Sequence, residues 1–547
     1  MVGQDPSSEK AGENKRPDMK QLMQHRQQVQ KHDSQIIRLG GLNFTDNYTD
    51  GELENADHIW TDRYPYFTTW HPREEVSGVS DVTAVTTWDD LIYISDGTMH
   101  VGNDTVEYLF SDEGPKQFAM MQNKLIVWPD KVYVNMTSLE VVPLAVNLTA
   151  ATATFQAHAL VFDTLAGVDL TNYFFPDDTI RISNLEGNYA VNNGWWRVES
   201  VEQHTLTFVM ADSQTFYTGS PTPKPVVERV IPSIDFITVQ NNRLWGVDNE
   251  EQAIWSSVQG DPCNFYTNKG IASDANAIPV SSPGDFTGIA ALGSQVLAFK
   301  NDTLYKVLGL YPEEYHTYTY HIEGVAPGCA PSMTIINDTL FYMSSHGVMA
   351  YGGATAQNVS QRLGPKGFTD AVGGTDGERY FLSCKNEQEQ LFLIYDINNG
   401  LWMREDGEEA LGFARLGDSC YALLDDGKIY KELAGDPVNS EFLWHMEFKP
   451  FYETTTGSDR KSVRAYELKR YHRLVFRVDV PEGSEADVYV KYDDGEWTEV
   501  AEIEGKKGIS AFPVPIRKCD CFRIKLMGNG PFTLLQLVRE YSLGSVR

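Results

Sequence analysis

Cysteine is scarce in this sequence of 547 residues, which contains six in total, and only Cys519 and Cys521 lie close together. Residues i and i+2 of a strand point to the same side, but the backbone between them resists a disulfide. A zinc site would need a second pair of ligands, and none lies near this one in the sequence. We therefore expect reduced cysteines and no bound metal.

Long apolar runs are also absent. No stretch of about 18 apolar residues occurs, so we expect no membrane-spanning helix. The opening "MVGQDPSSEKAGENKRPD" is polar and lacks the apolar core of a secretory signal. Residues 1–35 are rich in Gln and Lys and predict a flexible N-terminal arm, which would order only against a partner.

The sequence lacks the common catalytic motifs. It has no G-x-x-x-x-G-K-[ST] phosphate loop and no H-E-x-x-H zinc motif. The stretch "YMSSHG" places a serine beside a histidine, but no glycine precedes the serine, as a nucleophile elbow requires. We interpret Ser344 to Gly347 as a hairpin turn, with Gly347 at a positive-φ position and Leu340, Tyr342, Val348 and Tyr351 packing inside a sheet.

Acidic pairs are the remaining candidates for catalysis. Asp89-Asp90 and Asp425-Asp426 could serve as glycosidase carboxylates, but both pairs fall between expected strands, where Asp is favoured by local hydrogen bonding. "DINNGLW" (396–402) resembles the Asp-box turn of sialidase propellers without its preceding Ser/Thr, and a turn ending on a packed Trp402 explains it better. We assign no catalytic, cofactor-binding or metal-binding residue and expect no enzyme.

Basic residues are few: 45 Lys and Arg stand against 76 Asp and Glu, a net charge of −31. The excess is concentrated in residues 33–439, which carry 22 basic and 55 acidic residues, whereas residues 1–32 have a net charge of +2 and residues 440–547 of zero. Such a surface repels the phosphate backbone of nucleic acids. Two interpretations of this acidic charge remain open: it serves solubility alone, or it forms a surface that polyanions pass without binding.

What the sequence does contain is a repeat. Each unit has an apolar strand, a polar turn, a second strand and a closing strand, and most successive units are about 40 residues apart, which is typical of a β-propeller. The units fall at 82–101, 118–134, 234–257, 287–307, 332–351, 369–396 and 411–433. We therefore predict an all-β fold built on a propeller of about seven blades.

Two further regions break the repeat. Roughly 80 extra residues, 150–230, contain alternating strands and Asn-Gly turns, which predict a small β-barrel inserted in a propeller loop. From residue 436 onward, alternating stretches such as 473–503 predict an antiparallel β-sandwich. The propeller would then comprise residues 36–149 and 231–435.

Several stretches carry a resemblance to a known family. They are "GGLNFTDNYTDGELENADHIWTDRYPYFTTWHPRE" (40–74), "NNRLWGVDNEEQAIWSSVQGDPCNF" (241–265), "LFYMSSHGVMAYGGATAQNVSQRLG" (340–364), "IYDINNGLWMRED" (394–406) and "REYSLGS" (539–545). In this order they resemble the packaged-DNA stabilisation proteins, the tail nozzle or hub proteins, of short-tailed bacteriophages and of prophages of Gram-positive bacteria. One departure is "NVS" at 358–360, where that family has Ile-Ser after a proline.

The resemblance implies a structural protein of the virion, made in the bacterial cytoplasm. It would form a ring of six copies below the portal and adaptor proteins, contact other tail proteins or fibres, and retain the packaged DNA until ejection. DNA would pass through an acidic channel without specific binding. The alternative is a propeller that binds or hydrolyses glycans, which would gather carboxylates and aromatic rings at one mouth of the propeller.

Overall fold

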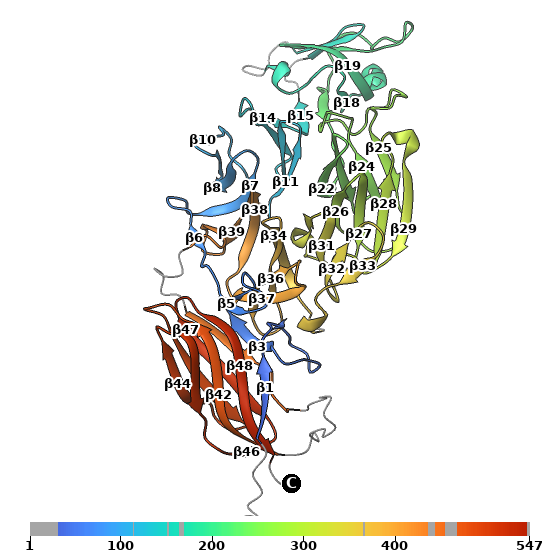
Figure 1. The fold of residues 1–547 in the computed structure, drawn as a ribbon. Helices are drawn as coiled ribbons and strands as arrows, with labels where there is room; N and C mark the ends of the chain where they lie inside the picture. Colours follow the sequence, from blue (N-terminus) through green and yellow to red (C-terminus); the bar gives the residue numbers. More distant parts are fainter. Residues whose placement is uncertain are drawn as a thin grey trace, which may run out of the picture.

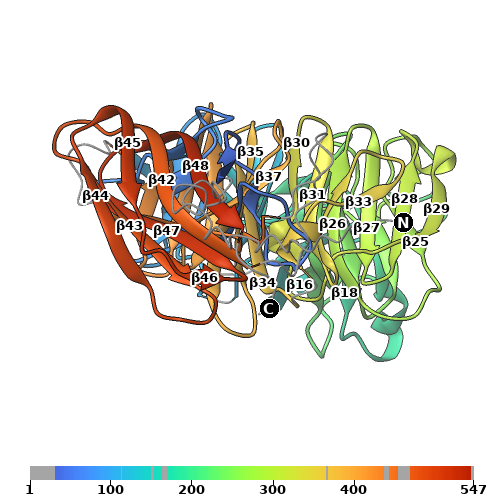
Figure 2. The same cartoon turned by 60° about the horizontal axis from the view of Figure 1, so that its bottom comes forward.

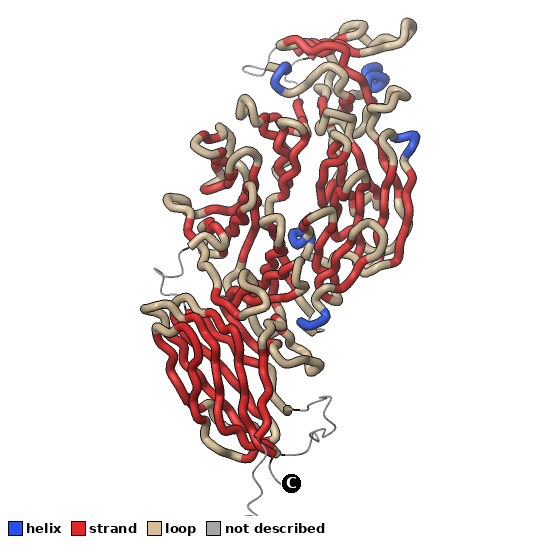
Figure 3. The backbone as a smooth tube through the Cα atoms, viewed as in Figure 1, coloured by secondary structure: helices blue, strands red, loops and turns tan. Residues whose placement is uncertain are grey.

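A computed structural model describes residues 31–112, 114–149, 153–162, 169–364, 367–435, 443–453 and 468–543. It consists of three parts in a row: a propeller in the middle, the inserted domain beside one side of its rim, and the C-terminal sandwich at the other end (Figures 1 and 2). Strands dominate throughout, and the helical elements of the described residues are short 3-10 turns (Figure 3). The predicted all-β fold is confirmed.

The propeller has seven blades, each a four-stranded antiparallel sheet. The strands, blade by blade, are β7 (Val82–Thr87), β8 (Leu91–Ser95), β9 (Thr98–Val101) and β10 (Asp104–Thr105); β11 (Gln117–Met121), β12 (Lys124–Trp128), β13 (Val132–Asn135) and β14 (Val141–Pro143); β22 (Ile234–Gln240), β23 (Arg243–Asp248), β24 (Ala253–Ser256) and β25 (Asn276–Pro279); β26 (Phe286–Leu292), β27 (Gln295–Lys300), β28 (Thr303–Leu308) and β29 (His316–His321); β30 (Thr334–Ile336), β31 (Thr339–Ser344), β32 (Gly347–Tyr351) and β33 (Ala356–Asn358); β34 (Thr369–Thr375), β35 (Arg379–Lys385), β36 (Gln390–Asp396) and β37 (Leu401–Asp406); β38 (Ala410–Leu416), β39 (Ser419–Leu424), β40 (Ile429–Lys431) and β6 (Glu74–Glu75).

Each predicted repeat unit lies in one blade, and the last blade closes the ring. Its outer strand, β6, comes from the N-terminal side of the first blade, with Glu75 opposite Tyr430 and Glu74 opposite Lys431. The inner strand of the same blade, β38, packs beside β7 of the first blade. Closure therefore joins segments about 350 residues apart in sequence, which removes the free end that an open row of blades would leave. Short connections η3 (Pro312–Glu314), η4 (Ala330–Ser332) and η5 (Gln361–Leu363) lie within or between blades.

The inserted domain is a seven-stranded sheet with a hydrophobic core of its own. Its elements are β15 (Val146–Thr149), β16 (Ala153–Phe155), β17 (Ala159–Phe162), η1 (Leu170–Asn172), β18 (Thr179–Ser183), η2 (Gly187–Asn192), β19 (Gly194–Glu202), β20 (Thr205–Phe208) and β21 (Val226–Arg229). Because β15 begins at Val146 and pairs with β21, the insert begins a few residues before the predicted boundary at 150.

The C-terminal part is a sandwich of two sheets, as predicted. One sheet holds β1 (Lys31–Ile36), β4 (Ile59–Trp60), β5 (Phe67–Thr69), β42 (Lys469–Asp479), β45 (Lys507–Pro513), β46 (Lys518–Cys519) and β48 (Thr533–Leu543). The other holds β2 (Gly41–Leu42), β3 (Glu52–Asp57), β41 (Leu443–Phe448), β43 (Glu485–Tyr492), β44 (Thr498–Glu504) and β47 (Phe522–Asn529).

Two predicted boundaries at the N-terminus are wrong. Residues 31–35 were expected in the flexible arm, but β1 pairs with the last strand over its whole length, from Lys31 opposite Ser542 to Ile36 opposite Leu537. Residues 36–69 were expected in the propeller, but β2 to β5 belong to the sandwich; for example, Leu53 lies opposite Phe448. The rest of the predicted arm, residues 1–30, lies outside the described residues.

The sandwich and the propeller share one hydrophobic core. A single cluster of buried side chains includes Trp60 and Trp70 from the N-terminal segment, Phe381 and Phe392 from the sixth blade, and Phe476 from the sandwich. Burial of aromatic side chains is worth about 1.5–3 kcal/mol each, so this shared core holds the two parts together. The N-terminal segment thus sits between the sandwich and the blades it closes.

Candidate functional site

A cavity of about 840 Å³ lies among the inner strands, with lining residues from the first strands of all seven blades and from the connection before the fifth blade. Small or apolar side chains line it, including Ala290, Gly373, Gly412 and Phe413, and Lys116 is the one charged residue among the described lining residues. The Lys116 ammonium is held 2.6 Å from Asp130 by an ion pair buried at both ends. The volume is that of a pocket for a small molecule, and its wall is not acidic.

The acidic charge lies instead on the loops around the two mouths of this cavity. In an antiparallel blade, the turn between the second and third strands and the connection to the next blade lie on the same face. We call this the acidic face, and its exposed carboxylates are those of Asp81, Asp96, Glu107, Asp112, Asp235, Glu250, Glu251, Asp285, Asp302, Asp370, Glu387, Glu408, Asp425 and Asp426. The side chains of Lys116 and Lys300 at this face are buried, and Lys428 is paired with Glu75 at 3.0 Å.

The opposite face is acidic as well. Its turns between first and second strands, or third and fourth strands, expose Asp89, Asp90, Asp338, Glu378 and Asp418. Exposed like charges repel an approaching polyanion over a Debye length of about 8 Å at physiological salt. Both mouths of the propeller therefore oppose the approach of nucleic acid.

A groove of about 620 Å³ opens on the acidic face between the third and fourth blades. Asp235, Asp285 and Asp302 line it together with the half-buried ring of Phe236. Partial burial raises the pKa of Asp235, and the nearby carboxylates of Asp248 and Asp285 raise it further. The groove therefore combines acidic groups with an aromatic wall.

The serine–histidine stretch is a hairpin turn, as predicted. Ser344 lies opposite Gly347, and its hydroxyl donates to the Gly347 carbonyl at 2.8 Å. His346 is exposed and lies 2.7 Å from Glu323. Gly347 has a φ of +116°, and Leu340, Tyr342, Val348 and Tyr351 are buried. Because the Ser344 hydroxyl is used within the turn, Ser344 and His346 do not form a nucleophile–base pair.

The acidic pairs also serve their turns. The Asp90 carboxylate accepts from the Leu91 amide at 2.9 Å, and the Asp426 carboxylate accepts from the Lys428 amide at 2.9 Å. In the Asp-box-like stretch, Asp396 accepts from the Asn399 amide at 3.0 Å, and the buried Trp402 indole donates to the Val359 carbonyl. The structure does not bring Asp89-Asp90 and Asp425-Asp426 together, because the two pairs lie on opposite faces.

All six cysteines are free, as expected, and five of them are buried. Within the described ranges, no group of three or more His, Cys, Asp or Glu side chains is arranged to hold a metal ion. No helix in the described part of the chain is long and apolar enough to cross a membrane.

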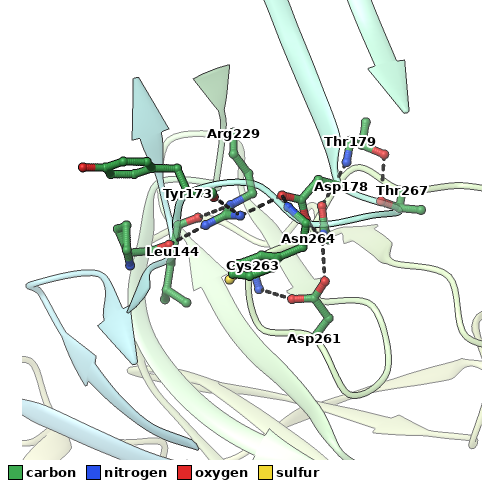
Figure 4. Close-up of polar contacts among 11 residues, drawn as sticks. Leu144, Tyr173, Asp178, Thr179, Arg229, Asp261, Cys263, Asn264 and Thr267 are labelled. Atoms are coloured by element: carbon green, nitrogen blue, oxygen red, sulfur yellow. Dashed lines mark hydrogen bonds and ion pairs between the residues drawn. The ribbon is translucent and has the colours of Figure 1, made fainter. Parts of the chain in front are cut away.

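A buried polar joint attaches the insert to the propeller (Figure 4). The Arg229 guanidinium pairs with Asp178 at 2.8 Å and donates to the backbone carbonyls of Leu144 and Tyr173. The other oxygen of Asp178 accepts from the side chain of Asn264, at 2.9 Å, in the long loop of the third blade. Two blades and the insert therefore meet at one ion pair.

A second buried charge cluster lies beside the closing strand of the propeller. Arg73 contacts Glu405 at 2.9 Å and Glu432 at 3.6 Å, and both carboxylates are almost fully buried. Burial raises the pKa of Glu432 to about 7 and raises the pKa of Glu405 well above its usual range. One cation thus faces two buried carboxyl groups, and the half-buried Asp406 carboxylate lies 3.3 Å from it as a third.

Neither cluster was predicted from the sequence, although strand alternation carries a signal for Arg229. Arg229 lies on the same side of β21 as the buried Val227, whereas the pairing register of β37 shifts at Glu405, so alternation gives no signal there. A charged residue at a core-facing position must be paired, because an unpaired buried charge costs several kcal/mol. Its partner, by contrast, lies in a distant segment that alternation does not reveal.

No family model matches the sequence, and no curated protein matches it. Among solved structures, a virginiamycin B lyase from Staphylococcus aureus is 9% identical, with a TM-score of 0.31, and the match covers 66% of this chain and 97% of that chain. An exo-beta-1,3-galactanase from Phanerochaete chrysosporium is 9% identical, with a TM-score of 0.21 and coverage of 57% and 96%. Hsv2 from Kluyveromyces lactis is 9% identical, with a TM-score of 0.26 and coverage of 59% and 97%. The chain is a β-propeller protein.

Proposed function

We propose that this chain is a structural protein of a tailed-phage virion, a nozzle or hub subunit that surrounds and retains packaged DNA. The observation that carries the proposal is the acidic charge around both mouths of the propeller, on loops that leave the carboxylates exposed. A protein that lets DNA slide needs a surface without phosphate affinity. The ordered resemblance over residues 40–74, 241–265 and 340–364 supports the same function.

The geometry limits where DNA could pass. The cavity on the propeller axis is small, and Lys116 is the one charged residue among its described lining residues, so it does not provide an acidic channel. In the proposed assembly, DNA would pass between subunits, along an outer surface that bears the loop carboxylates. Residues 440–547, which supply most of the sandwich, would then contact neighbouring proteins, because this segment has no net charge to keep like-charged subunits apart.

Immunogold electron microscopy tests this proposal. Antibodies against the full chain would be applied to phage particles released by the bacterial culture that carries the gene. We expect gold at the tail vertex of intact particles and none at the other vertices. Particles that bear no label, in a preparation where the chain is found only in the soluble fraction, would contradict the proposal.

The groove between the third and fourth blades favours a second candidate, a glycan-binding or glycan-hydrolysing protein. Burial, together with the nearby Asp285 carboxylate, raises the pKa of Asp235, and a raised pKa suits a general acid. The test is release of reducing sugar from polysaccharides of the bacterial surface. Activity that is lost in both Asp235→Asn and Asp285→Asn would favour this candidate over the structural one.

A further inference from the structure

The outer strands of the seven blades differ in how well their free edges are protected. β6 and β10 have two residues and β33 has three, while β14 and β25 end on Pro143 and Pro279. β37 has six residues, but the sandwich strands β2, β3 and β4 pack beside it. β29 (His316–His321) also has six residues, and within the described part of the chain no strand pairs with its outer edge. Among the described outer strands, β29 is thus the one that is both long and uncovered.

The residues of β29 do not protect it either. All six side chains of the sequence His-Thr-Tyr-Thr-Tyr-His are exposed, with Tyr318 at 48% and Tyr320 at 40%. Natural sheets protect exposed edges with lysine, proline, inward-pointing charges or bulges, and this strand has none of these. It lies at the outer margin of the molecule in two views, where a partner could reach it (Figures 1 and 2).

The register shows which backbone groups point outward. Lys300 and Thr303 close the two-residue turn between β27 and β28, so the two form a hydrogen-bonded pair. The next residue, Leu304, therefore turns its backbone groups toward β29, where it lies opposite Tyr320. By alternation, the N–H and C=O groups of Thr317, Thr319 and His321 point away from β28 and are available to another strand.

We propose that β29 pairs antiparallel with β29 of a second copy of this chain, about a two-fold axis at Thr319. Two identical strands can pair only if residues of equal parity face each other, because only every second residue has outward backbone groups. Centred on Thr319, the five-residue sequence Thr-Tyr-Thr-Tyr-His (317–321) is nearly symmetric. Thr319 then faces its own copy, Tyr318 faces the partner's Tyr320, and Thr317 faces the partner's His321.

Cross-strand chemistry favours this arrangement. Both tyrosine pairs would occupy the closely spaced, non-hydrogen-bonded positions, where aromatic pairs stabilise a sheet. The chain has a net charge of −31, so most of its surfaces repel a second copy, but β29 contains no acidic residue. The two fourth blades would form one continuous eight-stranded sheet.

The pairing does not rest on the proposed function. A two-fold contact uses the same surface on both copies and closes on itself, so it does not build a larger ring. A ring of subunits would need a separate interface. Loss of the β29 contact would therefore leave the virion proposal standing, and absence from virions would leave the dimer standing.

The test is the molar mass of the purified full chain by sedimentation equilibrium, compared with Thr319→Pro. Proline removes an N–H that points away from β28, so the blade keeps its own hydrogen bonds, but the interface loses two bonds because Thr319 faces its own copy. We expect the parent chain to form a dimer. In Thr319→Pro, the dissociation constant of the dimer should rise at least about tenfold. Thr319→Val retains the N–H and should dimerise like the parent chain.

A cysteine cross-link tests the register. Under mild oxidation, Thr319→Cys should form a disulfide-linked dimer, since residue 319 faces itself across the axis. Thr137→Cys, an exposed position in the second blade, is the matched control and should remain monomeric on a denaturing gel. A parent chain that stays monomeric at tens of micromolar, a dimer unaffected by Thr319→Pro, or equal cross-linking of the two cysteine variants would each overturn the proposal.

Discussion

Arg229 and Asp178 form an ion pair of 2.8 Å in which both side chains are fully buried, and this pair fixes the insert to the propeller. The remaining donors of Arg229 bond to backbone carbonyls, and Asp178 also accepts from Asn264 and from the Phe175 amide. Removing one partner of such a pair leaves the other charge buried and uncompensated. The joint is therefore more sensitive to a single truncation than to replacement of both partners.

We predict that Arg229→Ala lowers the free energy of unfolding by about 3–5 kcal/mol, because Asp178 would be left as an unpaired buried charge. Arg181→Ala is the matched control in the same domain. Arg181 pairs with Glu228 at 2.7 Å but is exposed, and such pairs contribute about 0–1 kcal/mol. Urea denaturation followed by tryptophan fluorescence measures both changes. Equal effects of the two substitutions would show that the joint does not depend on burial.

The glycine of the Ser344–Gly347 turn gives a second prediction. Gly347 has a φ of +116°, and a Cβ atom there would clash with the Ser360 hydroxyl, which binds the Val348 amide. We expect Gly347→Ala to destabilise the protein by about 1–3 kcal/mol. Gly352→Ala, in the same blade, is the control, because a Cβ atom there meets no other atom within 4 Å. A drop in the denaturation midpoint for Gly352→Ala as large as that for Gly347→Ala would contradict this account.

The Arg73 cluster predicts a dependence of stability on pH. Burial raises the pKa of Glu432 from 4.5 to about 7, so the folded state binds more protons than the unfolded state between these values. The free energy of unfolding should therefore fall as the pH rises from about 4.5 to 7, by up to about 3 kcal/mol from this group. Glu432→Gln should make the profile less steep, with the contribution of Glu405 remaining, and should be more stable than the parent chain at pH 8.

Thermal melting from pH 5 to pH 8 measures this difference. Glu408→Gln, at an exposed position on the acidic face, is the control and should retain the pH slope of the parent chain. If the dependence of stability on pH persists in Glu432→Gln but is lost in Glu405→Gln, the group that titrates is Glu405 and not Glu432.

The sequence predicted those parts of the fold that arise from local hairpins. Each blade is a run of strands joined by short turns, so its signal lies within about 40 consecutive residues. The N-terminal boundaries failed for the opposite reason. Leu53 pairs with Phe448 and Lys31 with Ser542, and pairing across such separations leaves no pattern in either segment. A two-residue strand such as β2 has too few residues to show alternation at all.

The same difference between local and long-range information applies to the candidate sites. The acidic bias of residues 33–439 was visible from composition, but its position on loops around the two mouths needed the blade topology. The joint of Arg229, Asp178 and Asn264 combines three segments, and only the inward position of Arg229 on its strand was visible beforehand. The exposure of β29 depends on what its neighbours leave uncovered, which no strand pattern reveals.

The acidic face gives the last prediction. The parent chain should not bind a DNA duplex at 50 mM salt, because exposed carboxylates repel phosphates. Replacing Glu250, Glu251, Asp425 and Asp426 with lysine reverses four charges on turns of two blades and should create binding that weakens steeply with added salt. The same four positions changed to glutamine remove the repulsion without adding cations and should bind more weakly than the lysine variant. Fluorescence anisotropy with a labelled duplex measures all three proteins. Tight binding of the duplex by the parent chain would contradict the proposal that DNA slides past this surface. It would show that cationic side chains among these loops bind the phosphates.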